Sequence, residues 1–131
     1  MHVGFSEEQL LLRDSARDFL ARECPMSLVR AQMESATGLP ETLWERMAGL
    51  GWMGLLVAEK HGGSGLGLVD VAVLLEEMGR VLLPGPFIGT AVVGALALQR
   101  AGNETQRAEC LPRIADGTLR TALAQLEQDA S

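Results

Sequence analysis

Positive charge is scarce in this sequence. Of its 131 residues, 11 are Lys or Arg and 17 are Asp or Glu, which gives a formal net charge of −6. Proteins that bind a phosphate backbone rely on clustered Lys and Arg, so we expect no nucleic-acid partner. The most apolar segment, 87–98, is short and contains Gly89, Thr90 and Gly94, whereas a membrane span needs about 20 apolar residues. We therefore expect no membrane insertion.

Cysteine is also scarce. The two cysteines, Cys24 and Cys110, lack the spacing of metal ligands, and we expect ordinary thiols and no metal site. At the N-terminus, Glu7 and Glu8 follow Ser6, where a signal or transit peptide would avoid acidic residues. The sequence therefore predicts a cytoplasmic protein.

Apolar residues make up 47% of the chain, enough for one core. They recur at spacings of three and four, which predicts an all-α bundle of five or six helices. Ser6 and Gln9 form a capping box for a first helix that ends near Arg22. Further helices are expected over 27–33, from Pro40 to about 50, over 68–82 with the stripe Leu68, Val71, Leu75, Met78 and Leu82, over 87–101, and from Asn103 to Gly117.

Four glycines between Gly62 and Gly67 predict a tight loop with positive φ angles and close backbone approach. The loop lacks the Lys and Ser/Thr of a nucleotide-binding P-loop, so we do not expect it to hold phosphates. His61 beside it is expected to be structural, because no orienting partner for a general base is evident. Glu76 and Glu77 are adjacent on a helix and are expected to cap, pair with Arg or face solvent. No catalytic residue is predicted.

The segment 87–101 is apolar on almost every side, which predicts a helix buried among other elements. Its many Gly and Ala residues allow close approach of either a neighbouring helix or an apolar ligand. Further on, Pro112 is expected to kink or divide the helix that begins at Asn103. Residues 119–126 alternate with a period near two, which favours a C-terminal strand-like tail.

Four pieces of this sequence carry a resemblance when taken in order. They read VAEKHGGSGLG, LLEEMGR running into LLPGPF, AGNETQRAECLPRIADG, and ALAQLE. Together they resemble the N-terminal helical domain of the acyl-CoA dehydrogenase family, flavoenzymes that desaturate acyl-CoA thioesters. The resemblance implies that residues 1–117 are this domain and that 118–131 open a middle β-domain lying beyond the chain. It covers nearly all of this sequence but only about the first third of a family member.

The resemblance also implies two sets of site residues. The start of the 87–101 helix would line the acyl pocket through Phe87, Ile88, Thr90 and Ala91. The tail would meet FAD through backbone groups of Leu123, Gln125 and Leu126. Leu126 stands where the family has a threonine and Gln128 where it has a proline, so a hydroxyl contact to the flavin is lost. The family's catalytic glutamate lies in a C-terminal domain, so the isolated chain is expected to be inactive.

Implied partners are the acyl-CoA substrate, an electron-transfer flavoprotein as electron acceptor, and further subunits in a homo- or hetero-oligomer. Three interpretations remain open at this point. The chain is either part of an FAD-dependent acyl-CoA dehydrogenase or a short, non-catalytic helical interaction or assembly subunit of a complex related to one. The residues also allow an unrelated all-α binding domain.

Overall fold

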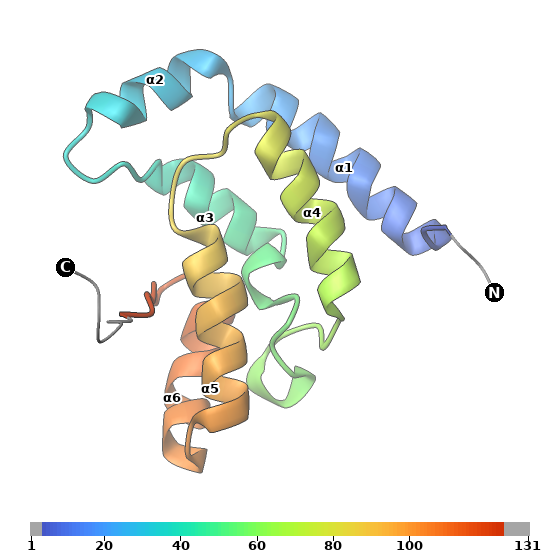
Figure 1. Cartoon of the computed structure of the whole chain (residues 1–131), viewed down its shortest axis with the longest axis vertical. Coiled ribbons are helices and arrows are strands. Elements are labelled where there is room, and N and C mark those ends of the chain that lie inside the picture. The colour runs from blue at the N-terminus through green and yellow to red at the C-terminus, as the bar shows by residue number, and fades with distance from the viewer. Residues whose placement is uncertain (1–3, 125–131) are drawn as a thin grey trace, which may run out of the picture.

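The computed structural model describes residues 4–124, and this part of the chain forms six α-helices (Figure 1). They are α1 (Glu7–Glu23), α2 (Met26–Glu34), α3 (Glu41–Gly49), α4 (Leu68–Arg80), α5 (Ala95–Ala101) and α6 (Glu104–Ala115). Two 3-10 turns, η1 (Trp52–Gly54) and η2 (Glu59–His61), lie between α3 and α4, and a π-helical segment, η3 (Ile88–Gly94), leads into α5. The predicted all-α fold is confirmed. No helix within 4–124 combines the length and apolar character needed to cross a membrane.

Helices α1 and α4 lie side by side along one edge of the molecule (Figure 1). The predicted capping box of α1 is present, with the Gln9 amide 3.2 Å from Ser6 Oγ and the Ser6 amide 3.0 Å from Gln9 Oε1. The side-chain amide of Gln9 also donates to Asp70 Oδ1 over 2.9 Å, and Asp70 accepts from the Gly67 amide at the start of α4. The cap of one helix therefore fixes the start of the other, and the two helices run in the same direction.

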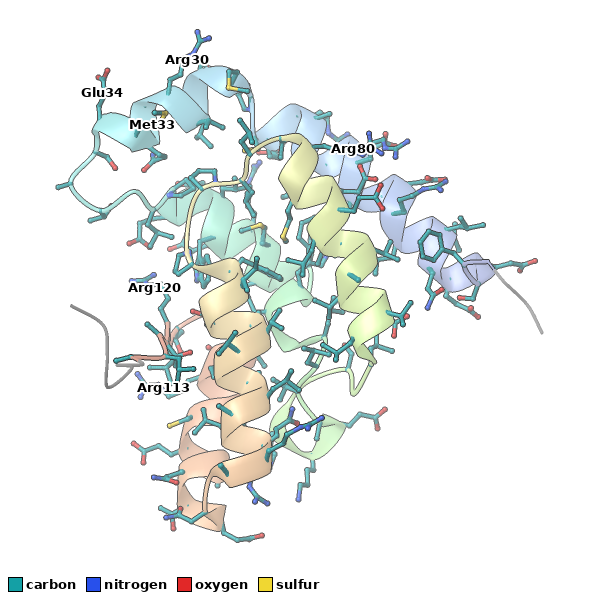
Figure 2. The ribbon with its side chains drawn as sticks, viewed as in Figure 1. Arg30, Met33, Glu34, Arg80, Arg113 and Arg120 are labelled. Carbon is teal, nitrogen blue, oxygen red and sulfur yellow. The ribbon has the colours of Figure 1, made fainter. Side chains whose placement is uncertain are left out.

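A buried carboxylate joins the same two helices near their C-terminal ends. Glu77 on α4 is 1% exposed and accepts two hydrogen bonds from the Arg17 guanidinium of α1, at 2.8 and 3.0 Å. Arg80, labelled on α4 in Figure 2, lies 3.4 Å from the same carboxylate and also pairs with the exposed Glu76. The hydrogen bonds and charge of Arg17 hold the pKa of Glu77 below its usual value despite burial. The predicted Arg pairing of the two glutamates is confirmed.

The main core is built from large side chains on α1, α3, η1 and α4. Leu20, Trp44, Met47, Met53 and Leu74 are all at most 2% exposed. The Trp44 indole donates to the carbonyl oxygen of Gly117 over 2.9 Å, which ties the end of α6 to α3. A second, smaller cluster of Val57, Ala95, Leu111, Ile114 and Ala115 holds α5 and α6 together.

The glycine-rich loop has the predicted shape. Gly62 and Gly65 have φ angles of +86° and +61°. A Cβ at Gly63 would lie 2.0 Å from the carbonyl oxygen of Val57, so only glycine fits there. Main-chain hydrogen bonds from Ser64, Gly65 and Leu66 to residues 54–57 fix the loop against the segment after η1. The loop therefore has a structural role, in which its main chain packs closely against residues 54–57.

The stripe predicted over 68–82 is wrong at both ends. Val71 and Met78 are buried, but Leu68 is 55% and Leu82 61% exposed. The helix ends at Arg80, so Leu82 lies in the turn that follows it. Leu68 is the first residue of α4 and lies where the helix begins at the surface.

The proline in α6 does not divide that helix, although division was one of the two predicted outcomes; the other, a kink, stays a prediction. Pro112 lies inside a continuous helix that runs to Ala115. Its missing N–H frees the carbonyl of Ala108, which belongs to an exposed residue and is open to water. Leu111 and Ile114 on either side are fully buried, and their packing maintains the helix through the proline. The predicted end signals are confirmed, since Asn103 and Gln106 form a capping box and Gly117 has a φ angle of +81°.

Two further predictions are corrected. Within residues 118–124 no strand is formed, because the amide of Thr121 donates to a side-chain oxygen on η3 and not to a neighbouring strand. The part of the predicted strand at 125–126 lies outside the described residues. The segment 87–101 is helical but is not buried on every side, since Ile88 is 57% exposed and Ala97 is exposed. Only one face of this segment packs on the core.

Candidate functional site

The π-helical segment η3 contains the residues in which the sequence suggested a ligand. The amide of Ala95 donates to the carbonyl of Thr90, five residues earlier, which is the hydrogen bond that defines a π turn. Such segments are rare and occur frequently at functional sites. Phe87, Thr90 and Ala91 are 3%, 0% and 3% exposed, whereas Ile88 is 57% exposed. The start of η3 therefore presents one large apolar side chain outward.

An apolar hollow of about 280 Å³ lies between the C-terminal half of α4 and the start of η3. Its lining residues are Leu75, Met78, Gly79, Leu82, Leu83, Gly85, Pro86, Phe87, Ile88 and Gly89. None of these has a titratable side chain, so the hollow is suited to an apolar group and carries no acid or base. Its volume is near the lower end of the roughly 300–1,000 Å³ typical of small-molecule pockets. An apolar ligand held here would need a second wall.

Two of the four residues assigned to the acyl pocket line this hollow. Phe87 and Ile88 contribute to its surface, and Gly89 continues it. Thr90 and Ala91 are not among its lining residues: Ala91 packs in the main core and Thr90 faces the C-terminal tail. The sequence assigned Leu82 to the stripe of the preceding helix and did not single out Leu83 or Gly85; all three lie in the turn after α4 and line the hollow.

A pair of threonines fixes the tail on η3. The hydroxyl of Thr90 donates to the Thr121 carbonyl over 3.3 Å and accepts from the Thr121 amide over 3.1 Å. The hydroxyl of Thr121 donates in turn to the carbonyl of Gly89 over 3.3 Å. A Cβ at Gly94 would lie 1.9 Å from Thr121 Oγ1, so the glycine makes room for this contact. The contact of Thr121 with η3 was not predicted. The only signal for it in the sequence was the pair Gly89 and Gly94, which leave room for a side chain on that face of the helix.

Beyond Thr121 the tail borders a second apolar hollow, of about 370 Å³, formed with α5 and α6. Leu123, the first of the three predicted flavin contacts, lines this hollow and is 64% exposed. Gln125 and Leu126, the other two, lie outside the described residues. Arg120, labelled in Figure 2, pairs with Glu41 of α3 over 3.2 Å and so fixes the tail on its other side.

His61 lies in η2, away from both hollows. Its Nε2 atom is buried and has no hydrogen-bond partner among residues 4–124. A general base needs a partner that orients it and access to the reacting proton, and neither is found at this nitrogen.

Comparison with known proteins identifies the family. The sequence profile described as "Acyl-CoA dehydrogenase, N-terminal domain" matches residues 6–118. The chain belongs to the acyl-CoA dehydrogenase family. A relative from Mycolicibacterium smegmatis, acyl-CoA dehydrogenase IpdE2, is 37% identical over 113 residues, which cover 86% of this chain and 35% of the relative. The resemblance inferred from the sequence is therefore confirmed.

Solved structures of acyl-CoA dehydrogenases share the fold. A variant of the steroid acyl-CoA dehydrogenase Tcur3481-Tcur3483 has a TM-score of 0.80 at 39% identity, covering 87% of this chain and 31% of that one. An acyl-CoA dehydrogenase from Bacillus anthracis, complexed with FAD, has a TM-score of 0.80 at 27% identity, covering 97% and 22%. The chain thus spans about a third or less of the length of these acyl-CoA dehydrogenases.

Proposed function

We propose that this chain is the N-terminal helical part of an FAD-dependent acyl-CoA dehydrogenase and supplies one wall of its acyl pocket. The observation that carries the proposal is the hollow between α4 and η3, whose lining residues all have apolar side chains or are glycine and include no titratable group. It lies in a chain whose family is that of acyl-CoA dehydrogenases. Burying an apolar chain against such a surface is favourable by about 25 cal/mol per Å².

Within this wall the four predicted residues have different roles. Phe87 and Ile88 contact the acyl group directly, since both line the hollow. Thr90 and Ala91 act behind them: Ala91 seats η3 in the core and Thr90 holds the tail. The substrate is an acyl-CoA thioester, which the parent enzyme desaturates between its α and β carbons.

FAD supplies the redox chemistry when bound. The residues present fit a peripheral role in holding FAD. Thr90 bonds to Thr121 and Glu41 pairs with Arg120, so the tail is attached to the helices just before the exposed Leu123. Leu123, Gln125 and Leu126 would then contribute main-chain groups along the flavin. In this proposal residues 1–117 are the N-terminal domain and 118–131 lead into the next one.

The partners follow from the same proposal. The parent enzyme passes electrons to an electron-transfer flavoprotein and works as a homo- or hetero-oligomer. The exposed apolar side chains of this chain support further subunits or domains, with Met33 80% and Leu123 64% exposed. The second candidate function is a short, non-catalytic assembly subunit of a related complex, favoured by Leu126 in place of the family's threonine.

The test uses the full-length product of the gene. Purified protein should show flavin absorbance, and anaerobic addition of an acyl-CoA should bleach it. Ile88→Trp fills the hollow and should raise the acyl-CoA concentration needed for bleaching. Leu50→Trp is the matched control, because Leu50 is 52% exposed at the end of α3 and does not line the hollow.

One result would count against the enzyme, and another against the position of its acyl group. A colourless protein that co-purifies with a separate flavoprotein would favour the assembly subunit. A flavoprotein in which Ile88→Trp and Leu50→Trp bleach alike would refute the placement of the acyl group in this hollow.

A further inference from the structure

The C-terminal end of α4 has the two hydrogen bonds of a Schellman motif. The Leu83 amide donates to the carbonyl of Met78 over 3.0 Å, and the Leu82 amide donates to that of Gly79 over 3.2 Å. Val81 is the C-cap, so Leu82 occupies the left-handed position that follows it. Its φ angle is +53°, and it is the only residue other than glycine with a positive φ within 4–124.

Glycine is the usual residue at this position, because the Cβ of any other residue comes too close to the following carbonyl oxygen. Leu82 gains little in return from burial, since its side chain is 61% exposed. The same turn does use glycine three residues later, where Gly85 has a φ of +110°. The fold alone therefore does not account for a leucine here, and residues held in such conformations cluster at functional sites.

Leu82 is one of the residues that line the apolar hollow. Met78 and Phe87 form its buried part, at 4% and 3% exposure, whereas Leu82 and Ile88 are 61% and 57% exposed. These two exposed side chains come from the two segments that enclose the hollow, the turn after α4 and the first residue of η3. Leu82 therefore belongs to the rim that an entering ligand meets.

We propose that Leu82 is a specificity-determining residue, which packs on the acyl group that enters this hollow. The inference rests on the proposed function. The leucine side chain supplies apolar contact at the cost of a strained backbone. Replacing it by glycine relieves the strain and removes the contact. Replacing it by asparagine, which also tolerates the left-handed region, relieves the strain and keeps a side chain of similar size but makes it polar.

The experiment compares the full-length wild-type enzyme with Leu82→Gly, Leu82→Asn and the control Leu50→Ala. Each is assayed with butyryl-CoA, octanoyl-CoA, palmitoyl-CoA, a branched acyl-CoA and a ring-bearing acyl-CoA, and the best substrate of the wild type is the reference. Both Leu82 variants should lower kcat/KM for the reference about 10-fold, through KM. The value for butyryl-CoA should not change, and the melting temperature should stay the same or rise. Leu50→Ala should match the wild type.

Several results would overturn the inference. An equal loss for all substrates, or a lower melting temperature, would show that Leu82 acts on folding alone. The acyl group would be shown not to reach Leu82 if the ratio of kcat/KM for the reference substrate to kcat/KM for butyryl-CoA is unchanged in the variants. The same would follow if butyryl-CoA is the best substrate of the wild type. If no acyl-CoA bleaches the flavin of the wild type, the proposed function fails and the inference with it; bleaching with an unchanged ratio refutes the inference alone.

Discussion

Replacing Gly94 by alanine tests how the tail is attached to η3. The new Cβ would lie 1.9 Å from Thr121 Oγ1 and 3.1 Å from Thr121 Cβ, so the threonine has to move by more than 1 Å to reach ordinary contact. Rotation of the Thr121 side chain breaks the bond from its hydroxyl to Gly89. Because Thr121 Cβ also lies only 3.1 Å from the new Cβ, its main chain shifts as well and weakens the two bonds to Thr90, so up to three hydrogen bonds are lost. Each neutral hydrogen bond contributes about 1 kcal/mol. Alanine recovers about 1 kcal/mol of helix propensity, which leaves a net loss of up to about 2 kcal/mol.

Urea unfolding followed by tryptophan fluorescence measures this loss, because Trp44 and Trp52 are both buried in the core. Gly79→Ala is the matched control: a Cβ at this exposed helical glycine would meet no atom within 4 Å, so the variant should be more stable by about 0.5–1 kcal/mol. In a Thr121→Gly background, Gly94→Ala should no longer destabilise. If Gly94→Ala is as stable as Gly79→Ala, or if its cost persists without Thr121, the clash is not the cause and the reasoning fails.

Three other changes have definite expected outcomes. Gly63→Ala drives a Cβ into the main-chain oxygen of Val57 and should destabilise by about 3 kcal/mol, measured by urea unfolding; a loss under about 1 kcal/mol would mean that the loop can shift. Trp44→Phe leaves the Gly117 carbonyl without its indole donor and should cost about 1–2 kcal/mol, with an altered near-ultraviolet circular dichroism spectrum; no change in stability would contradict the role of that bond. The lowered pKa of Glu77 means that its pairing with Arg17 stabilises the fold above the unfolded pKa of about 4.3 and that this stability is lost as the pH falls through the lower folded pKa. Glu77→Gln should therefore flatten the fall in melting temperature between about pH 5 and pH 3, and an identical pH profile would refute the assignment.

The helix starts could be predicted because their chemistry is local. The capping boxes at Ser6 and Asn103 join residues three positions apart, and both form as expected. Gly51 and Gly117 end their helices for an equally local reason, since glycine tolerates positive φ. The family resemblance depended on the same kind of information, short segments in a fixed order.

The errors involve contacts that local sequence rules do not describe. The alternation of residue types over 119–126 indicated a strand. In the structure Thr121 bonds to the side chain of Thr90, 31 residues earlier, and not to a neighbouring strand. Pro112 was expected to kink or divide its helix; the helix is not divided, and the flanking residues Leu111 and Ile114 are fully buried. The π turn at Thr90 left no mark that helical periodicity could reveal, so the outward position of Ile88 could not be foreseen.

Leu82 marks the point where the two kinds of information conflict. By the local rule a left-handed helix end calls for glycine, and the prolines at 84 and 86 place the helix end later than it is. A search of the sequence for a glycine at the end of α4 therefore finds Gly85 and passes over Leu82. Natural sequences usually keep local preference and overall fold consistent, and the exceptions are expected at functional or strained sites. A strained, exposed leucine on the rim of the one apolar hollow between α4 and η3 is such an exception, and it makes this residue the sharpest test of what the hollow binds.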